Sequence, residues 1–408
     1  WVSDASRYGD VAAVMREPAR LPLARFSSED IQVMLAHEKI ERIDAAEARC
    51  WTSGFTTPRW EKKLRRPVFE TALNRSLRRD LLRKCRYPSR LQRRQRLKGA
   101  RFVVEFDFKA WFDQIELHPE VRKFFVFRWR DENGADVFFQ LTRLPMGACF
   151  APTCAQAVTW ALIDGLASEM VDVSTMIDNV RIASSDPREF LRAVREFLRR
   201  CAHVGASLGD INVEGLALSP HDLTDDMWLQ VGQANATQHC FLGEMTHIVD
   251  GDVYTANTLR LVEKLRTAYN NVCGWLRGEL PARSRRNIAA LCGLVFWMAH
   301  TVNVPLSQLF SLLRLSSALG RDASAGGWDA PVTYIAPSAG RCLDSIVAFL
   351  LANRPAPTPA VQLPTDPRKQ YDSVIVVDAS GDAWGAYVFR PDGTATELAA
   401  GWCNFEGY

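Results

Sequence analysis

Two aspartates stand at the ends of apolar segments, where a charged side chain needs a partner. Asp107 follows the β-rich run 102–106, and Asp178 lies at the tip of an apolar hairpin predicted over 173–183. A buried carboxylate is costly alone, and two brought together repel each other unless a cation neutralises them. Phosphoryl transfer uses such a pair, because shared carboxylates hold two Mg²⁺ ions at the reacting phosphate. A lone aspartate at either place is more simply a turn former or cap, so both must belong to one ordered set of motifs.

Short motifs surround these aspartates in a defined order. They are Arg65–Asn74 (RRPVFETALN), Asp107–Ile115 (DFKAWFDQI), Leu144–Ala148 (LPMGA) with Ala151–Pro152, Met176–Asn179 (MIDN), Phe241–Gly243 (FLG), and Val377–Ser380 (VDAS) with Trp384–Ala386 (WGA). Each motif is weak alone. In this order they resemble the reverse transcriptases of LTR- and DIRS-type (VIPER-like) retroelements. The resemblance implies a right-hand polymerase followed by the first strands of a ribonuclease H domain.

The resemblance also implies a role for each motif. Asp107, Asp178 and Asn179 would form the catalytic set, with Asp107, Asp178 and Phe108 as metal ligands. A primer-grip hairpin, Phe241, Leu242 and Gly243, would position the primer end. The residues implied to contact the incoming nucleotide or the template are Arg65, Phe108, Lys109, Ala110, Trp111, Phe112, Met146 and Gly147.

Within that set, Phe112 would be a steric gate, because an aromatic ring beneath the incoming sugar leaves no room for a ribose 2′-hydroxyl. The alternative for this residue, taken alone, is a core aromatic. Met146 is likewise compatible with an apolar cover for its own loop.

Three departures from the family pattern bear on activity. Asn179 stands where the family has a third carboxylate, and its neutral amide oxygen is a weaker ligand for a hard cation. Met176 replaces the usual tyrosine. No lysine lies between Lys123 and Lys264, so the usual candidate for protonating pyrophosphate is missing. These losses leave open a slow enzyme or a fold that no longer catalyses.

The ribonuclease H part rests on fewer residues. That nuclease chemistry also needs two metal ions and several carboxylates. Asp378 alone lies at a matching place, so we expect this part, as it stands, not to be a working nuclease.

Charge favours a polyanionic partner. The 408 residues are 47% hydrophobic and 24% charged, with a net charge of +3, but the window 75–101 carries +11 and the remainder −8. Such a block is typical of a surface for phosphates, with Arg93, Arg94 and Arg96 as expected contacts. A solvated basic helix or an import tract would give the same pattern. The ten cysteines lack metal-ligand spacing, which favours reduced thiols over a zinc site.

The order of periodic segments predicts an α+β fold in four parts. The expected parts are an N-terminal helical extension over 1–60, fingers and palm over 61–250, thumb and connection over 251–355, and an incomplete ribonuclease H-like α/β domain over 368–408. The expected helices include 28–46, 151–170, 187–204, 259–277 and 284–319. A proline-rich linker is expected over 355–367.

The sequence therefore predicts an RNA- and DNA-templated DNA polymerase, a reverse transcriptase. Its partners would be a primer–template of RNA or DNA and deoxynucleoside triphosphates, and its cofactor Mg²⁺ or Mn²⁺. The rival is a decayed or domesticated reverse-transcriptase fold that binds RNA or a protein. No apolar run is long enough to span a membrane and no signal segment is visible, so we expect an intracellular protein that is not secreted.

Overall fold

The chain divides into two units in a computed structural model, Trp1–Thr358 and Pro359–Tyr408. The described residues are 23–47, 52–59, 64–71, 73–76 and 87–359 in the first unit, and 374–379, 383–389 and 395–402 in the second. Side chains are described over 23–47, 67–71, 73–74 and 87–359.

The N-terminal described segment begins with helix α1 (Ser28–Ala36). Its start is fixed by a capping box between Ser27 and Asp30, which fits the serine-rich start of the predicted helix. Its end is a Schellman motif, in which the Lys39 N–H donates to the Met34 carbonyl and Glu38 takes a φ of 50°. The predicted helix over 28–46 is therefore wrong beyond Ala36.

A strand occupies part of the segment after Ala36 that was predicted to be helical. Strand β1 (Ile40–Ile43) pairs antiparallel with β6 (Asp136–Leu141), whose other neighbour is β5 (Val126–Arg130). The region predicted as a helical extension thus contributes a strand to a three-stranded sheet with β6 and β5. A second pair, β2 (Thr52–Arg59) and β3 (Leu64–Thr71), precedes the short helix α2 (Leu73–Ser76).

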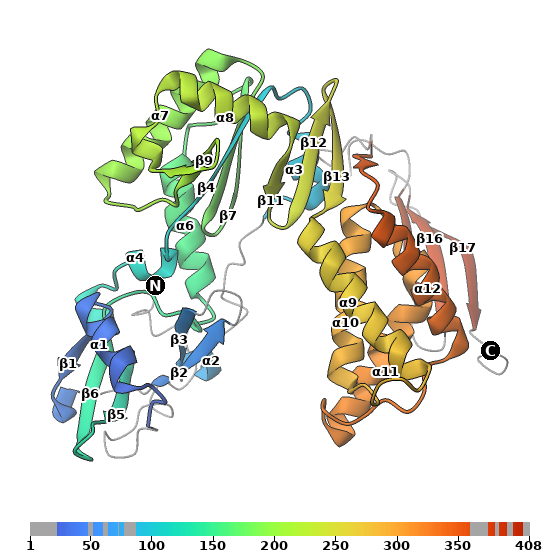
Figure 1. The fold of residues 1–408 in the computed structure, drawn as a ribbon, viewed down its shortest axis with the longest axis horizontal. Coiled ribbons are helices and arrows are strands. Elements are labelled where there is room, and N and C mark those ends of the chain that lie inside the picture. Colours follow the sequence, from blue (N-terminus) through green and yellow to red (C-terminus); the bar gives the residue numbers. More distant parts are fainter. Residues whose placement is uncertain are drawn as a thin grey trace. The chain divides into compact units, whose positions relative to one another are not determined.

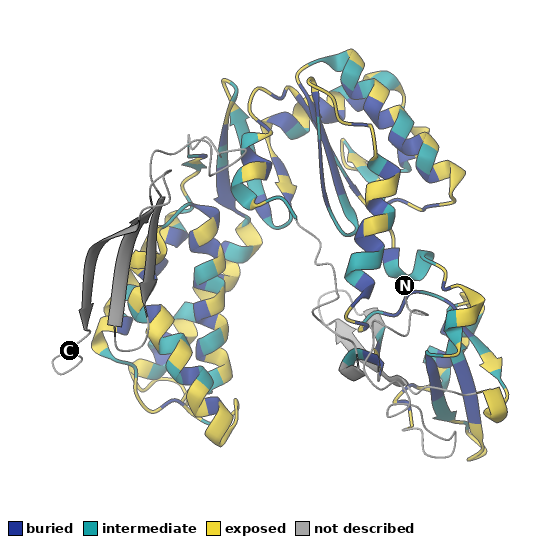
Figure 2. Ribbon diagram, turned by 180° about the vertical axis from the view of Figure 1, so that it is seen from behind, coloured by how far each residue is buried: buried dark blue, intermediate teal, exposed yellow. Residues whose placement is uncertain are grey.

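The palm sheet has the strand order β4 (Phe102–Asp107), β8 (Asn179–Ser184), β7 (Val171–Met176). Side chains alternate between its faces, so Phe102, Val104 and Phe106 share one face. On that face the Phe106 ring lies 4.9 Å from Phe197 of α7 (Pro187–His203) and 5.6 Å from Trp228 of α8 (Asp225–Thr237). The other face of β4 carries Glu105 and Asp107. Figure 1 shows α7 and α8 beside the sheet, and Figure 2 shows that its strands are largely buried.

Helix α6 (Ala151–Ile163) also packs against the palm sheet. It ends before Asp164 and Gly165, whose φ is +68°, so the predicted helix over 151–170 is too long at its C-terminal end. The remaining short elements of this region are α3 (Arg90–Gln95), α4 (Trp111–Gln114), α5 (Pro119–Arg122), β9 (Ile211–Val213) and β10 (Leu216–Leu218).

A second antiparallel sheet links the palm sheet to the helical part of the first unit. Its strand order is β11 (His239–Phe241), β12 (Glu244–Val249), β13 (Asp252–Asn257), β14 (Ala356–Pro357). The helices that follow share a separate hydrophobic core and are α9 (Leu259–Leu276), α10 (Arg285–Thr301), α11 (Phe310–Gly326) and α12 (Pro337–Ala352). The predicted helix over 284–319 is two helices, because Asn303 takes a φ of 60° and Pro305 follows.

The second unit forms a three-stranded antiparallel sheet in the order β15 (Val374–Ala379), β16 (Ala383–Phe389), β17 (Ala395–Trp402). Asp378 lies in β15, and its side chain is outside the described residues. In the part of the chain that the structure describes, no helix combines the length and the apolar character that crossing a membrane requires.

Candidate active site

The two predicted aspartates lie at the same end of the palm sheet. Asp107 lies opposite Asn179 in the β4–β8 register, and cross-strand partners project from the same face. Met176 pairs with Asn179, so Ile177 and Asp178 form the two-residue turn between β7 and β8. The Phe108 N–H donates to the Asp178 carbonyl at 3.0 Å, which holds this turn beside the end of β4. Asp107 is exposed, whereas Asp178 and Asn179 are half-buried. The structure therefore brings the three predicted catalytic residues together.

The turn that carries Asp178 is held by two buried polar residues that the sequence reasoning missed. Ile177 takes a φ of 58°, which is strained for a β-branched residue. Its N–H donates to Gln156 Oε1 at 2.6 Å, and its carbonyl lies 2.5 Å from the Thr159 hydroxyl. Trp111 Nε1 donates to the same hydroxyl at 3.1 Å, which ties the Asp107 motif to the Asp178 turn.

The sequence could have singled out Gln156 and Thr159, because they are polar residues on a mostly apolar helix. Gln156 and Thr159 are three residues apart on a mostly apolar helix, so they share one face, and both are fully buried. Buried polar side chains are almost always hydrogen-bonded, and such a pair predicts a specific partner. The sequence does not identify that partner, because it comes from another element.

The segment after Asp107 divides into core and exposed residues. Phe108 and Trp111 are buried and stack with centroids 4.0 Å apart, so only their backbones are available to a ligand. Ala110 takes a φ of 47° and begins α4. Phe112 is half-buried and packs against the edge of the core.

Lys109 lies near the place of the lysine that the family pattern has after the palm strands and that this sequence lacks. The Gly209 N–H donates to the Asp107 carbonyl at 2.6 Å, which fixes the following loop beside the end of β4. Lys109 Nζ lies 3.0 Å from Asp210 Oδ1 in that loop, and the two side chains are 55% and 47% exposed. A cation from the Asp107 segment thus lies at the loop where the family pattern expects a lysine.

The loop at Met146 and Gly147 docks on β3 and α2. The Met146 carbonyl accepts from the Phe69 N–H at 2.7 Å. Gly147 has a φ of +113°, and a Cβ there would lie 2.4 Å from the Phe69 carbonyl oxygen, so no other residue fits. Asn74 holds the loop by donating to the Gly147 carbonyl at 2.9 Å and accepting from Cys149 N–H at 2.9 Å. Arg65 lies in β3, and its side chain is outside the described residues.

The residues predicted to form a primer grip lie in a tight hairpin between β11 and β12, which is called the primer-grip hairpin after that prediction. Leu242 and Gly243 take φ values of 51° and 80°, as in a type I′ turn, between Phe241 of β11 and Glu244 of β12. Phe241 is buried beneath the Arg181 guanidinium, which lies 4.7 Å from the ring centroid. Leu242 is half-buried.

Arg181 belongs to a buried polar row behind the catalytic residues. It pairs with Glu105 in the β4–β8 register, two residues from Asn179 and Asp107 respectively. Burial raises the pKa of Glu105 to about 8 despite the attraction of Arg181. Burial also lowers the pKa of Arg181 to about 10. The row therefore lies between the Asp107 end of the palm sheet and Phe241 of β11.

Part of the basic block is buried, which corrects the prediction for Arg93 and Arg94. These residues are only 9% and 3% exposed, so they do not form a phosphate-binding surface. Glu244 Oε1 lies 2.9 Å from Arg90 Nε and 3.2 Å from Arg94 Nη2. Arg96, in contrast, keeps 53% of its side chain exposed while it lies 3.5 Å from Asp172.

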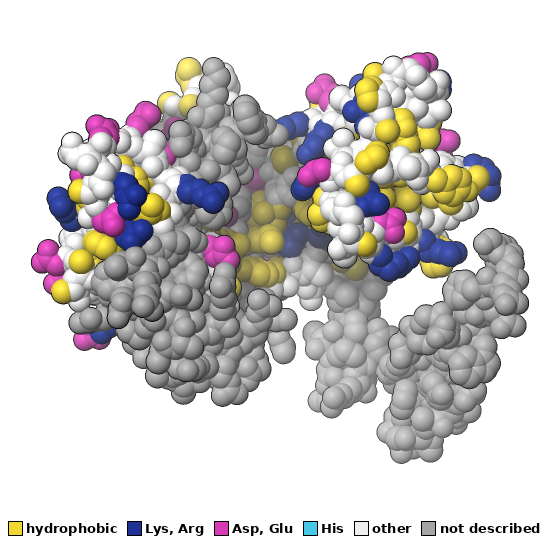
Figure 3. All heavy atoms as spheres, turned by 90° about the horizontal axis from the view of Figure 1, so that it is seen from below, with side chains coloured by type: hydrophobic (Ala, Val, Ile, Leu, Met, Phe, Trp, Pro, Cys, Tyr) yellow, Lys and Arg dark blue, Asp and Glu magenta, His cyan; other side chains and the backbone are white. Residues whose placement is uncertain are grey.

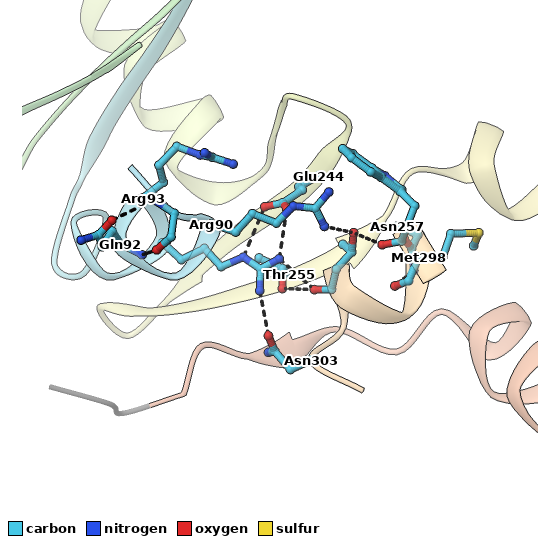
Figure 4. Close-up of polar contacts among 12 residues, drawn as sticks. Arg90, Gln92, Arg93, Glu244, Thr255, Asn257, Met298 and Asn303 are labelled. Carbon is cyan, nitrogen blue, oxygen red and sulfur yellow. Dashed lines mark hydrogen bonds and ion pairs between the residues drawn. The ribbon is translucent and has the colours of Figure 1, made fainter. Parts of the chain in front are cut away.

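The same ion pairs join three elements (Figure 4). Arg94 donates to the Asn303 side chain at 2.9 Å and to the Thr301 carbonyl at 3.0 Å. The Thr255 hydroxyl donates to that carbonyl at 2.8 Å. The cluster therefore fixes α3, the sheet of β12 and β13, and the end of α10 to one another. Residues 77–86 of the basic block lie outside the described residues.

These features define a class: a mixed α/β polymerase fold of the reverse-transcriptase type, with two aspartates at the end of the palm sheet. Residues 58–210 match the family described as reverse transcriptase (RNA-dependent DNA polymerase). That region contains Asp107, Asp178 and the Gly147 loop. Among curated proteins, none matches the sequence.

Solved structures of the foamy viral protease-reverse transcriptase share this fold. One, in complex with an RNA/DNA hybrid, has a TM-score of 0.58 at 14% identity, covering 97% of this chain and 46% of that one. Another, a dRH form in complex with double-stranded DNA, has a TM-score of 0.54 at 14% identity, covering 95% of this chain. The chain spans only 60% of the length of that second protein.

Proposed function

We propose that the chain is a reverse transcriptase of an LTR- or DIRS-type retroelement. In this proposal it extends a primer 3′ end with deoxynucleoside triphosphates, copying RNA or DNA. The observation that carries the proposal is the placement of Asp107 opposite Asn179 and beside Asp178 at one end of the palm sheet. The match of residues 58–210 to the reverse-transcriptase family supports it.

The donor atoms at this site fit a hard divalent cation. Within the described residues, no group of three or more His, Cys, Asp and Glu side chains is placed to hold a metal ion. A cation at this site would therefore also need backbone, water or substrate oxygens as ligands. Two carboxylates and the Phe108 carbonyl are oxygen donors of the kind that Mg²⁺ shares with substrate phosphates. Mg²⁺ or Mn²⁺ bound there would neutralise phosphate charge and activate the primer 3′-hydroxyl. Asp107 and Asp178 would hold it.

The neighbouring residues would bind and orient the nucleotide. Lys109 is exposed beside Asp107 and would supply positive charge to the triphosphate. Arg65 of β3 would contact the triphosphate from the fingers. The Met146–Gly147 loop, held by Asn74, would lie near the incoming base and the template. In the same proposal, the second unit is the start of a ribonuclease H fold with Asp378 in its first strand.

Phe112 should control sugar selection. Replacing Phe112 with valine keeps an apolar side chain but removes the ring, so ribonucleotides should be incorporated roughly 10- to 100-fold more readily. The measurement is the ratio of kcat/KM for a deoxynucleotide to that for its ribonucleotide. Equal ratios in both proteins would leave Phe112 as core packing only.

One observation favours the rival function, a nucleic-acid- or protein-binding fold without catalysis. Asn179 Nδ2 donates to Asp178 Oδ1 at 2.8 Å, and this amide occupies a lone pair that a metal would use. An aspartate at that position could not donate this bond. The loss of the third carboxylate therefore weakens the site in two ways.

Restoring that carboxylate is a direct test. Asn179→Asp removes the competing donor and adds a ligand, so primer extension with Mg²⁺ should rise by roughly 3- to 30-fold. The preference for Mn²⁺ over Mg²⁺ should fall at the same time. If the variant and the wild type extend at equal rates, Asn179 is a tolerated substitution.

Primer extension on an RNA template decides between the two functions. The full chain is incubated with an annealed DNA primer, deoxynucleoside triphosphates and either Mg²⁺ or Mn²⁺. Extension that requires Asp107 and Asp178 supports the polymerase. Tight binding of the same primer–template with no extension under either metal would favour the non-catalytic fold.

A further inference from the structure

One buried hydroxyl, that of Thr159 in α6, contacts both segments that carry the proposed metal ligands. Figure 3 shows hydrophobic side chains lying among Lys and Arg on one face of the described surface, so composition there singles out no residue. Thr159 differs because it is fully buried and its partners come from two other elements. Trp111 Nε1 lies 3.1 Å from the hydroxyl oxygen, and the Ile177 carbonyl oxygen lies 2.5 Å from it.

The direction of these two hydrogen bonds follows from the hydroxyl having a single proton. A threonine hydroxyl donates once and accepts through two lone pairs. Within a helix its proton often goes to the carbonyl four residues earlier. The Ala155 carbonyl lies at 3.1 Å, farther away than that of Ile177. The Thr159 proton therefore goes to Ile177, while a lone pair accepts the Trp111 indole N–H, and each of these bonds strengthens the other.

The link continues on both sides to the proposed metal ligands. The Trp111 ring stacks on Phe108 with centroids 4.0 Å apart, and Phe108 directly follows Asp107. On the other side, Ile177 directly precedes Asp178. The Phe108 N–H donates to the Asp178 carbonyl at 3.0 Å. The hydroxyl thus closes a ring of contacts that runs through the backbones of both segments.

A site with two carboxylates depends on such a ring. Like charges repel, so without a cation nothing in the carboxylates themselves keeps Asp107 and Asp178 at a fixed spacing. Mg²⁺ demands near-ideal octahedral geometry at short ligand distances. The backbones that carry the ligands must therefore be held before the ion arrives.

We propose that Thr159 is a positioning residue of the metal site. Its hydroxyl, bonded to the Trp111 indole and to the Ile177 carbonyl, fixes the spacing of Asp107, Phe108 and Asp178. The proposal rests on the proposed function, because the role of these three residues as metal ligands comes from it.

The test is Mn²⁺ binding to the full chain without nucleic acid or nucleotide, with free Mn²⁺ measured by electron paramagnetic resonance. The binding that Asp178→Asn removes identifies the site. Thr159→Val is near-isosteric but lacks the hydroxyl, and it should weaken this binding by roughly 10- to 100-fold. Thr159→Ser keeps the hydroxyl and should stay within about two-fold of the wild type. In primer extension, Thr159→Val should lose more rate with Mg²⁺ than with Mn²⁺, since Mg²⁺ tolerates distorted geometry poorly.

A second variant tests the link from its other end. Trp111→Phe removes the indole N–H but keeps a ring to stack on Phe108. It should weaken Mn²⁺ binding in the same direction. Since both variants break one link, the double variant with Thr159→Val should bind Mn²⁺ no more weakly than Thr159→Val alone, whereas independent effects would add.

Thr255→Val is the matched control. It removes another fully buried threonine hydroxyl that donates to a backbone carbonyl of a different element, that of Thr301 at 2.8 Å. Its general cost to stability should resemble that of Thr159→Val, because both leave a buried carbonyl without its donor. Its Mn²⁺ affinity should equal that of the wild type.

Four outcomes would overturn the proposal. They are wild-type Mn²⁺ affinity in Thr159→Val, an equal loss in Thr159→Ser or in Thr255→Val, wild-type affinity in Trp111→Phe, and a wild type without any Mn²⁺ binding that depends on Asp178. If Thr159→Val fails to fold, Trp111→Phe decides. A chain that binds Mn²⁺ with this dependence on Thr159 but does not extend primers refutes the polymerase and leaves the positioning role standing. An extending chain whose Thr159→Val variant is unaffected refutes only the positioning role.

Discussion

Replacing Asp178 with asparagine should lower the rate of primer extension at least about a thousand-fold, or about 4 kcal/mol in activation free energy. The substitution removes one of the two carboxylates that we propose as metal ligands at the end of the palm sheet. Asp178 is half-buried and near-isosteric with asparagine, and its carbonyl bond to the Phe108 N–H does not depend on the side chain. The turn should therefore keep its shape while the metal-binding charge is lost.

The measurement is single-turnover incorporation of one nucleotide with Mg²⁺ and with Mn²⁺, together with the thermal melting temperature. Asp113→Asn is the matched control. Asp113 belongs to the same sequence motif, but its Oδ2 lies 2.7 Å from Lys39 Nζ, and that pair is partly exposed. The control should keep its rate within about two-fold, since partly exposed pairs contribute little. Equal rates in Asp178→Asn and the wild type would remove Asp178 from the catalytic set.

The sequence predicts where the strands of the palm sheet end, because the runs of apolar residues that form these strands end there. Apolar runs on either side of Asp107 and Asp178 predict the strands β4, β7 and β8, and the observed register brings the two aspartates together. The predicted turn at the Asp178 tip also forms. The partners of that turn, Gln156 and Thr159, come from a helix that is close only after folding. No local sequence pattern predicts that these two side chains bond to the turn.

The basic block, in contrast, was predicted wrongly at Arg93 and Arg94, because its composition does not show what the arginines face. A cluster of arginines has the same composition whether it faces phosphate or a buried carboxylate. Glu244 lies 150 residues after Arg94 in the chain, and nothing near either residue predicts that they pair. The over-long helix predicted after Ser28 fails for a related reason, because the strand at Ile40–Ile43 is stabilised by pairing with the distant β6. Tertiary partners outweigh local propensity in both places.

Replacing Glu244 with glutamine should destabilise the first unit by about 3–5 kcal/mol, since it leaves buried arginines without a counter-charge. Glu244 is buried, and it is an attractive partner for Arg90, Arg93 and Arg94. Burial already lowers the pKa of Arg90 and of Arg93, and the Glu244 charge opposes that effect. Without the carboxylate, the mutual repulsion of these guanidinium groups is no longer offset.

The loss is measured as the shift in urea midpoint, followed by circular dichroism. Replacing Glu244 and Arg94 together with leucine should recover part of it, because a buried ion pair exchanged for apolar side chains costs little. Glu196→Gln is the control, since its pairs with Arg199 and Arg200 lie on the surface, and its midpoint should stay at the wild-type value. A midpoint equal to that of the wild type would mean that Asn303 and the Thr301 carbonyl satisfy Arg94 unaided, and that the ion pair does not hold β12 to α3.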